Sequence, residues 1–599
     1  MVGAGAVAML GTVAATTTVA TARDANNTKH VLLFSVDGLH QSDLEQFVKV
    51  HPDSTLARLT EAGTQYTNAS TSRPSDSFPG VLAPVTGGTP KSTGVFYDDS
   101  YSRTAFTPSA QTNTSTQDCS GPPGAETQYA ENLDVNAPST ANNQTGTRTI
   151  LGEKIDPTQL PYELINGKCV PVYPNDFLHS NSIFTVAHQA GLATAWSDKH
   201  PAYQIVNGHG TPNSVDDLFT PEINADIIPD RLTDTRGNTI SFPFPNSTGN
   251  AAGPVITDYV GNTEAYDQIK VDAILNEIDG KTSTGAPATN DPPAIFGMNF
   301  QSVSVGQKTV DPTLTCDPKR SVDVTKCDPN YVPGGYVATA QGMTFTPQLD
   351  GVTTYASGVK TPGALNYVDR ALSAMVNELN GRGLYNSTEI IIEAKHGQAP
   401  IDPSKLARIG HAETTVLNNA GIQTAQVTDD DVALIWLADQ SKASSAVEAL
   451  QASVGNGNPA HIATILHGEQ LAKLYHNPGS DSHTPDIIVL PTLGTIYSGS
   501  HAKVAEHGGF STDDTHVALI VVNGGGQPGG KVDEAVQTTQ IAPTILRALG
   551  LNPGALDAVR MEAPRLFRSD RHSGSNLRLP RKTRRHLCPA RRAVEEGVD

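Results

Sequence analysis

Two short segments near the N-terminus carry residues that could perform phosphoryl or sulfuryl transfer. Asp37 follows the apolar run HVLLFSV, so we expect a carboxylate at the carboxyl end of a buried strand, where open α/β sheets bind their ligands. Ser77 precedes a Phe-Pro step at the expected first turn of a helix, where unpaired amides stabilise an alkoxide or phosphate oxygen. Either segment alone is also ordinary turn or capping chemistry. Their order and spacing together indicate half of a metal-assisted transfer site.

Later strands end in further candidate residues. Lys395 and His396 follow the run EIIIEA, and His507 lies in a loop that enters the strand HVALIVV. Lys199 and His200 follow LATAWS, where they either reach a substrate or form salt bridges within a loop. Because the carboxyl ends of parallel strands meet at one edge of a sheet, these side chains become candidates for a shared site.

Alternating strand-like and helical runs must position these residues. The pattern predicts an α/β fold with a doubly wound, mostly parallel central sheet, helices on both faces and a loop-rich cap insertion. Residues of about 98–180 and 200–265 are rich in Asn, Thr, Pro and Gly, and we expect them to form long loops or the cap. The expected strands are HVLLFSV, LATAWS, PAIFGMNF, TEIIIEA, DVALIWL, DIIVLP and HVALIVV.

The chain resembles the alkaline phosphatase superfamily, and within it the type I phosphodiesterase/nucleotide pyrophosphatase branch, from about His30 to Gly550. SVDG matches the first metal-ligand motif, Ser77-Phe78-Pro79 the nucleophile motif, and EHGGF the loop that carries the last histidine ligand. The resemblance implies that a metal-activated Ser77 attacks phosphorus to form a covalent phospho-enzyme, which water then hydrolyses.

Departures from the family pattern change the expected metal site. Lys395 stands where the family has Asp before His-Gly, and Gln301 and Gln307 lie near the positions of another Asp and His, where we expect them to contact substrate. One carboxylate and two imidazoles cannot offset two divalent ions, and amides are poor zinc ligands. We therefore expect at most one ion, zinc before calcium or magnesium, with Lys395 supplying catalytic charge. The implied ligands are Asp37, Ser77, His396 and His507.

Composition restricts partners and compartment. The formal charge of −20 over 599 residues argues against a nucleic-acid partner, and no run reaches the length of a membrane span. Residues 1–22 resemble an export signal without a basic start, residues 23–567 form the expected catalytic domain, and the basic tail 568–599 is expected to be disordered.

Cysteines and sequons fit an exported protein. Four body cysteines pair most simply as Cys119–Cys169 and Cys316–Cys327, although three connectivities exist, and Cys588 is left in the tail. The N-x-S/T sequons are at Asn26, Asn68, Asn113, Asn143, Asn246 and Asn386.

The leading hypothesis is an exported hydrolase of small phosphate esters or phosphodiesters. A sulfatase or phosphomutase of the same superfamily is the first alternative, but Val81 stands where the sulfatase motif C/S-x-P-x-R requires Arg. A secreted binding protein that retained the fold without activity is the second.

Overall fold

An eight-stranded sheet forms the centre of the computed structural model. β1 is parallel to both β12 and β17, β12 is parallel to β8, and β8 to β9, whereas β25 is antiparallel to β17 and β2. The prediction of a mostly parallel α/β sheet is therefore confirmed. In spatial order the strands are β26 (Gly530–Val532), β2 (Thr64–Tyr66), β25 (Ile520–Asn523), β17 (Thr388–Glu393), β1 (His30–Val36), β12 (Ile295–Phe300), β8 (Ala195–Ser197) and β9 (Asp217–Phe219).

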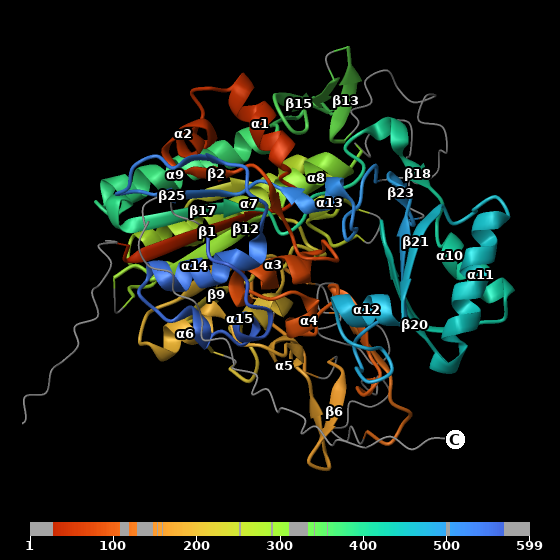
Figure 1. The fold of residues 1–599 in the computed structure, drawn as a ribbon. Helices are drawn as coiled ribbons and strands as arrows, with labels where there is room; N and C mark the ends of the chain where they lie inside the picture. The colour runs from red at the N-terminus through yellow and green to blue at the C-terminus, as the bar shows by residue number, and fades with distance from the viewer. Residues whose placement is uncertain are drawn as a thin grey trace, which may run out of the picture. The chain divides into compact units, whose positions relative to one another are not determined.

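Helices cover both faces of this sheet (Figure 1). Alternate residues of β1 point to opposite sides, so Leu33 packs in one apolar core and Leu32 in the other. The core around Leu33 receives α3 (Ser77–Thr86), α6 (Ile183–Gln189), α14 (Ile541–Ala548) and α15 (Asp557–Glu562). The core around Leu32 receives α1 (Gln41–Val50), α2 (Thr55–Ala62), α7 (Val260–Ile278), α8 (Ser302–Lys308) and α9 (Ala364–Gly381).

A second, antiparallel sheet lies beside the first (Figure 1), with the order β19 (Thr424–Asp429), β20 (Ala433–Leu437), β22 (Ile487–Pro491), β21 (Ile462–His467). It contains the runs DVALIWL and DIIVLP, so assigning them to the central sheet was wrong. β20 is buried on both faces, which is why it has the continuous apolar run of a central strand. Its faces pack against α10 (Ala412–Asn419) and α11 (Ala443–Gly455) on one side and α12 (Glu469–Leu474) on the other.

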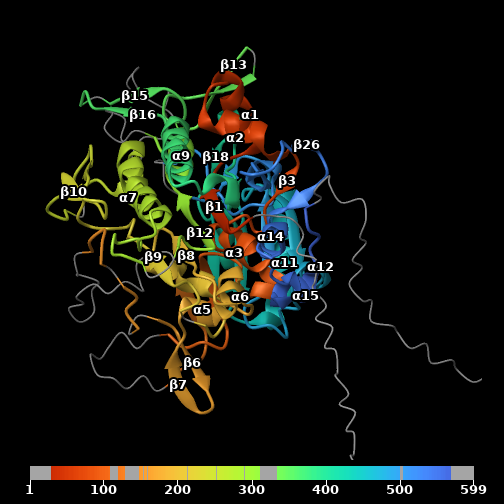
Figure 2. The same cartoon turned by 90° about the vertical axis from the view of Figure 1, so that its left-hand side faces the viewer.

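The two expected insertions contain more regular structure than loops. The first holds the hairpins β4 (Asp99–Ser102) with β5 (Ala125–Gln128) and β6 (Tyr162–Ile165) with β7 (Lys168–Pro171). The β6–β7 hairpin projects away from the central sheet in both views (Figures 1 and 2). The second holds the 3-10 helix η1 (Pro201–Asn207) and the hairpin of β10 (Arg231–Thr233) with β11 (Thr239–Ser241). It also supplies β9 and the start of α7, which belong to the core.

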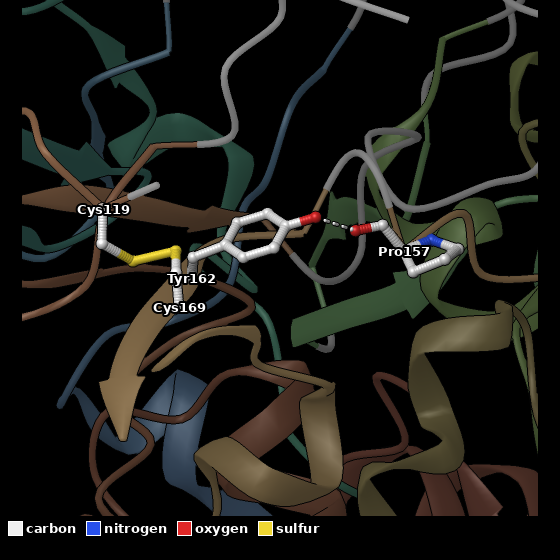
Figure 3. The surroundings of a disulfide bond; sticks show 4 residues. All are labelled: Cys119, Pro157, Tyr162 and Cys169. Atoms are coloured by element: carbon white, nitrogen blue, oxygen red, sulfur yellow. Dashed lines mark hydrogen bonds between the residues drawn. A yellow bond between two sulfur atoms is a disulfide. The ribbon is translucent and has the colours of Figure 1, made fainter. Parts of the chain in front are cut away.

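The predicted disulfide Cys119–Cys169 is confirmed and ties β7 to the segment before β5 (Figure 3). Beside it, the Tyr162 hydroxyl donates a hydrogen bond to the Pro157 carbonyl oxygen at 2.8 Å. Cys316, Cys327 and Cys588 lie outside the described residues.

The structure describes residues 28–107, 119–128, 148–152, 154–157, 160–211, 213–250, 253–288, 291–310, 334–340, 342–355, 357–498 and 503–567. The predicted export signal, the basic tail and the sequons at Asn26, Asn113 and Asn143 lie outside these ranges. In the part that is described, no helix combines the length and apolarity that crossing a bilayer would require.

The three described sequons differ in accessibility. Asn68 and Asn386 are exposed. Asn246 is buried, and its Nδ2 donates to the carbonyl oxygen of Asn250 at 3.0 Å. A glycan on Asn246 would break that contact, so only Asn68 and Asn386 remain predicted acceptors among these three.

Candidate active site

Four parallel strands of the central sheet end at one edge and deliver the predicted residues there. Asp37 follows β1, Lys395 and His396 follow β17, Lys199 follows β8, and Gln301 follows β12. The edge is the carboxyl end of each strand, where ligands of doubly wound sheets bind.

Ser77 opens α3 and is fully buried. The preceding Asp76 caps the helix, because its carboxylate accepts the Phe78 amide at 3.1 Å and also the Asp98 amide at 2.9 Å. Gly80 lets α3 approach the sheet, since a Cβ there would collide with the backbone oxygen of Lys395. The helix therefore holds the Ser77 hydroxyl against the ends of the central strands.

The ammonium that contacts the hydroxyl belongs to Lys199. Its Nζ donates to Ser77 Oγ at 3.2 Å and lies 3.7 Å from Asp37 Oδ2, and the side chain is buried. Of the two interpretations open for Lys199, the geometry favours a contact in the site, because its ion-pair partner Asp37 lies at the end of β1 and not in the same loop.

Lys395 is held by a different set of partners. Its Nζ lies 3.2 Å from Asp37 Oδ2 and 3.6 Å from Asp198 Oδ1, and it donates to the Tyr203 hydroxyl at 3.2 Å. Burial lowers the pKa of this ammonium, but the charges of Asp198 and Asp37 outweigh burial and raise it overall. Burial likewise raises the pKa of Asp37, yet Lys395 and Lys199 lower it below its ordinary value. Lys395 thus neutralises two buried carboxylates, whereas Lys199 contacts Ser77.

His396 and His507 lie side by side, with ring centroids 4.0 Å apart and ring planes tilted by 37°. Burial lowers the pKa of both imidazoles well below the ordinary value, so both are neutral at pH 7. His396 Nε2 lies 4.0 Å from Asp37 Oδ2, and His507 Nδ1 lies 3.4 Å from Asp76 Oδ1. Neutral imidazole is the form that binds metals.

Unpartnered atoms test whether these residues fit a metal ion. Asp37 Oδ1, His396 Nε2 and His507 Nδ1 are all buried without a hydrogen-bond partner. One carboxylate and two neutral imidazoles form a donor set that suits one divalent ion. A second ion does not fit, because the ammonium of Lys395 contacts the same carboxylate.

The remaining predicted residues divide between the site and its surroundings. Gln301 and His200 line the cleft that contains Ser77, and His200 Nδ1 lies 2.8 Å from Glu222 Oε1. Gln307 points elsewhere, since its Nε2 donates to the Gly38 oxygen at 2.7 Å and to Asp43 Oδ2 at 2.9 Å. Gln307 therefore supports the turn after β1, and it is not among the cleft-lining residues.

A buried polar network behind Asp37 was missed from the sequence. Lys270, in the middle of α7, donates to Asn299 Oδ1 at 2.6 Å and lies 3.1 Å from Asp267 Oδ1. Asn299 Nδ2 in turn donates to Asp37 Oδ2 at 3.3 Å. The only signal was an Asp and a Lys three residues apart on the face of a helix that buries its side chains.

The cleft around Ser77 has a volume of about 470 Å³. Its walls come from the strand ends, from both insertions and from β19. Charged residues of both signs line it: Lys199, Lys308 and Lys503 face Asp98, Asp99, Asp258, Asp429, Asp430 and Glu506.

Comparison with known proteins identifies the class. The model of the type I phosphodiesterase/nucleotide pyrophosphatase family matches residues 31–215 and 342–514, more than half of the chain. The chain belongs to this family, within the alkaline phosphatase superfamily, and is a phosphoric ester hydrolase. No curated protein sequence matches it.

Solved structures with low sequence identity also match the chain. Wild-type alkaline phosphatase PafA is 12% identical with a TM-score of 0.50, over 88% of this chain and 96% of that chain. Murine ectonucleotide pyrophosphatase/phosphodiesterase 5 is 13% identical with a TM-score of 0.46 over the same shares. At this identity the PafA match shows an alkaline phosphatase-like fold. Enzymes of this superfamily depend on metal ions.

Proposed function

We propose that the protein hydrolyses small phosphodiesters with Ser77 as the nucleophile. The observation that carries the proposal is the 3.2 Å contact between Lys199 Nζ and Ser77 Oγ at the N-terminus of α3. A buried ammonium stabilises the alkoxide of a serine, and the helix end adds to its effect. Ser77 therefore becomes a competent nucleophile in the cleft.

The reaction proceeds in two displacements. Ser77 Oγ attacks phosphorus, the bond from phosphorus to the leaving alcohol breaks, and the Ser77 proton passes to that alcohol. Water then attacks the same phosphorus, the bond from phosphorus to Ser77 Oγ breaks, and a proton of the water restores the Ser77 hydroxyl as a phosphomonoester leaves. Throughout, the ammonium of Lys199 stabilises the negative charge that builds up beside Ser77 Oγ.

Lys395 supports this chemistry indirectly, through the two carboxylates that it neutralises. By neutralising Asp37 and Asp198, it keeps the strand ends from repelling an anionic substrate. This refines the expectation that Lys395 acts on the Ser77 hydroxyl, because Lys199 occupies that position.

Asp37, His396, His507 and Ser77 would hold one divalent ion, zinc before calcium or magnesium. Such an ion supplies Lewis-acid charge to an ester oxygen when it is bound. The unpartnered buried atoms of Asp37, His396 and His507 support this assignment. Membership of a metal-dependent superfamily supports it as well. Removal of the ion by a chelator should therefore abolish turnover.

Small esters are the proposed substrates, and an oxidising compartment outside the cytoplasm is the proposed location. A cleft of about 470 Å³ accommodates a drug-sized molecule. The disulfide Cys119–Cys169 supports export, since such bonds persist in oxidising compartments. Gln301 and His200 line the same cleft and are the proposed substrate contacts besides Lys199.

Hydrolysis of bis(4-nitrophenyl) phosphate tests the proposal. We expect Ser77→Ala to lose at least about a thousandfold in rate, because a covalent nucleophile typically contributes that much. Ser70→Ala is the matched control, since its hydroxyl bonds only the Val536 carbonyl oxygen outside the cleft. Retained turnover by Ser77→Ala would refute the mechanism. Turnover of 4-nitrophenyl sulfate instead of the diester would favour the sulfatase alternative, and turnover of neither ester would favour a binding protein.

A further inference from the structure

A second cluster of metal-ligating side chains lies where α10 meets β19. His411 precedes α10, Glu413 is in its first turn, and Asp429 ends β19. Each residue offers one ligand atom, and these atoms all lie within 4.8 Å of one another. The cluster is separate from Ser77 and the strand ends of the central sheet, and no sequence motif pointed to it.

Glu413 provides the independent sign that a ligand is missing. Its side chain is fully buried, and Oε1 accepts a hydrogen bond from Thr414 Oγ1 at 2.9 Å. Oε2 has no hydrogen-bond partner. Within the described ranges, no lysine or arginine lies within 4.0 Å of this carboxylate. Burying a carboxylate oxygen without a hydrogen-bond donor costs free energy. A bound cation at this position would remove that cost.

Asp429 and His411 place two further ligand groups beside Glu413. Asp429 places a second carboxylate oxygen within 4.8 Å of the Glu413 ligand atom. His411 Nδ1 lies 2.7 Å from Asp429 Oδ2. The His411 side chain is 67% exposed, whereas that of Asp429 is 7% exposed. An exposed imidazole thus lies beside two recessed carboxyl groups.

We propose that His411, Glu413 and Asp429 bind one divalent transition-metal ion. One imidazole and two carboxylates suit Zn²⁺, whereas Ca²⁺ and Mg²⁺ prefer sites made entirely of oxygen.

The position of the cluster suggests what the ion does. Asp429 lines the cleft that contains Ser77, beside Asp430 and on the same wall as Thr428. A cation there offsets part of the acidic lining and favours entry of an anionic ester. This role rests on the proposed function, whereas the metal site itself does not.

Zn²⁺ titration of the chelator-treated full-length protein tests the site. We expect His411→Ala to bind one Zn²⁺ fewer than wild type, or to bind that ion at least about tenfold more weakly. His188→Ala is the matched control, because His188 also pairs with an aspartate, Asp216, at 2.8 Å but belongs to no three-ligand cluster among the described residues.

Further variants separate this ion from one at the strand ends. Glu413→Gln should lose the same ion as His411→Ala, whereas His396→Ala should leave it bound. Equal Zn²⁺ binding by His411→Ala and wild type would overturn the proposal, as would full retention of the ion in Glu413→Gln. If His396→Ala binds as much Zn²⁺ as wild type while His411→Ala binds less, the metal site proposed at the strand ends is refuted and the site at His411 is supported.

Discussion

The ends of the central strands and the His411 cluster both gather buried carboxylates, but they balance the charge differently. At the strand ends, Asp37 has two ammonium groups at 3.2 and 3.7 Å, and its pKa is lowered. Beside β19, Glu413 has no ammonium partner in the described structure, and burial raises its pKa to about 7. In the proposed account, fixed ammonium groups supply positive charge beside Ser77, and an exchangeable cation would supply it beside β19.

Lys199 should show the largest effect of any lysine at the strand ends. We expect Lys199→Met to lower kcat/KM by about 100- to 1,000-fold, because it removes the ammonium that stabilises the Ser77 alkoxide. Steady-state kinetics with a chromogenic phosphodiester measure the effect. Lys281→Met is the control, since that lysine pairs with Asp279 outside the cleft. Equal losses in both variants would contradict a specific role for Lys199.

Lys395 should matter more for stability than Lys199 does. Lys395→Met leaves Asp37 and Asp198 as buried charges without their common partner, and breaking such a buried pair costs about 3–5 kcal/mol. Thermal unfolding should show the loss, and adding Asp198→Asn should recover part of it. If the double variant is no more stable than Lys395→Met, the ammonium is not neutralising Asp198.

Glu393 should give an effect that is visible only as a pH dependence of stability. Burial raises the pKa of Glu393 from 4.5 to about 8, so the folded protein keeps a proton that the unfolded chain releases. Stability should therefore fall as pH rises from about 5 to 8, by up to about 1.4 kcal/mol per pH unit from this group. Chemical denaturation of Glu393→Gln should show a flatter dependence than wild type. An identical slope would mean that Glu393 is ionised in the folded state.

The sequence allowed the strand-end residues to be predicted because they follow apolar runs directly. Asp37, Lys395 and His396 come one to three residues after a buried strand, so strand order alone brings them together. Ser77 was predictable from its place before Phe-Pro at a helix start.

Contacts that depend on tertiary structure could not be predicted. Nothing in WSDKH distinguishes a lysine that reaches Ser77 from one in a surface loop, because Lys199 and Ser77 are far apart in the chain. The run DVALIWL has the continuous apolar pattern of any strand buried on both faces. The sequence therefore could not show that it belongs to a second sheet. His411 and Asp429 are 18 residues apart, and only the packing of α10 on β19 joins them.

The stereochemical course at phosphorus tests the central claim most directly. Hydrolysis of a phosphodiester made chiral with sulfur and an oxygen isotope distinguishes one displacement from two, since each in-line displacement inverts the configuration. The mechanism through a phosphorylated Ser77 has two displacements and predicts net retention. Net inversion would show direct attack by water and would contradict Ser77 as a covalent nucleophile.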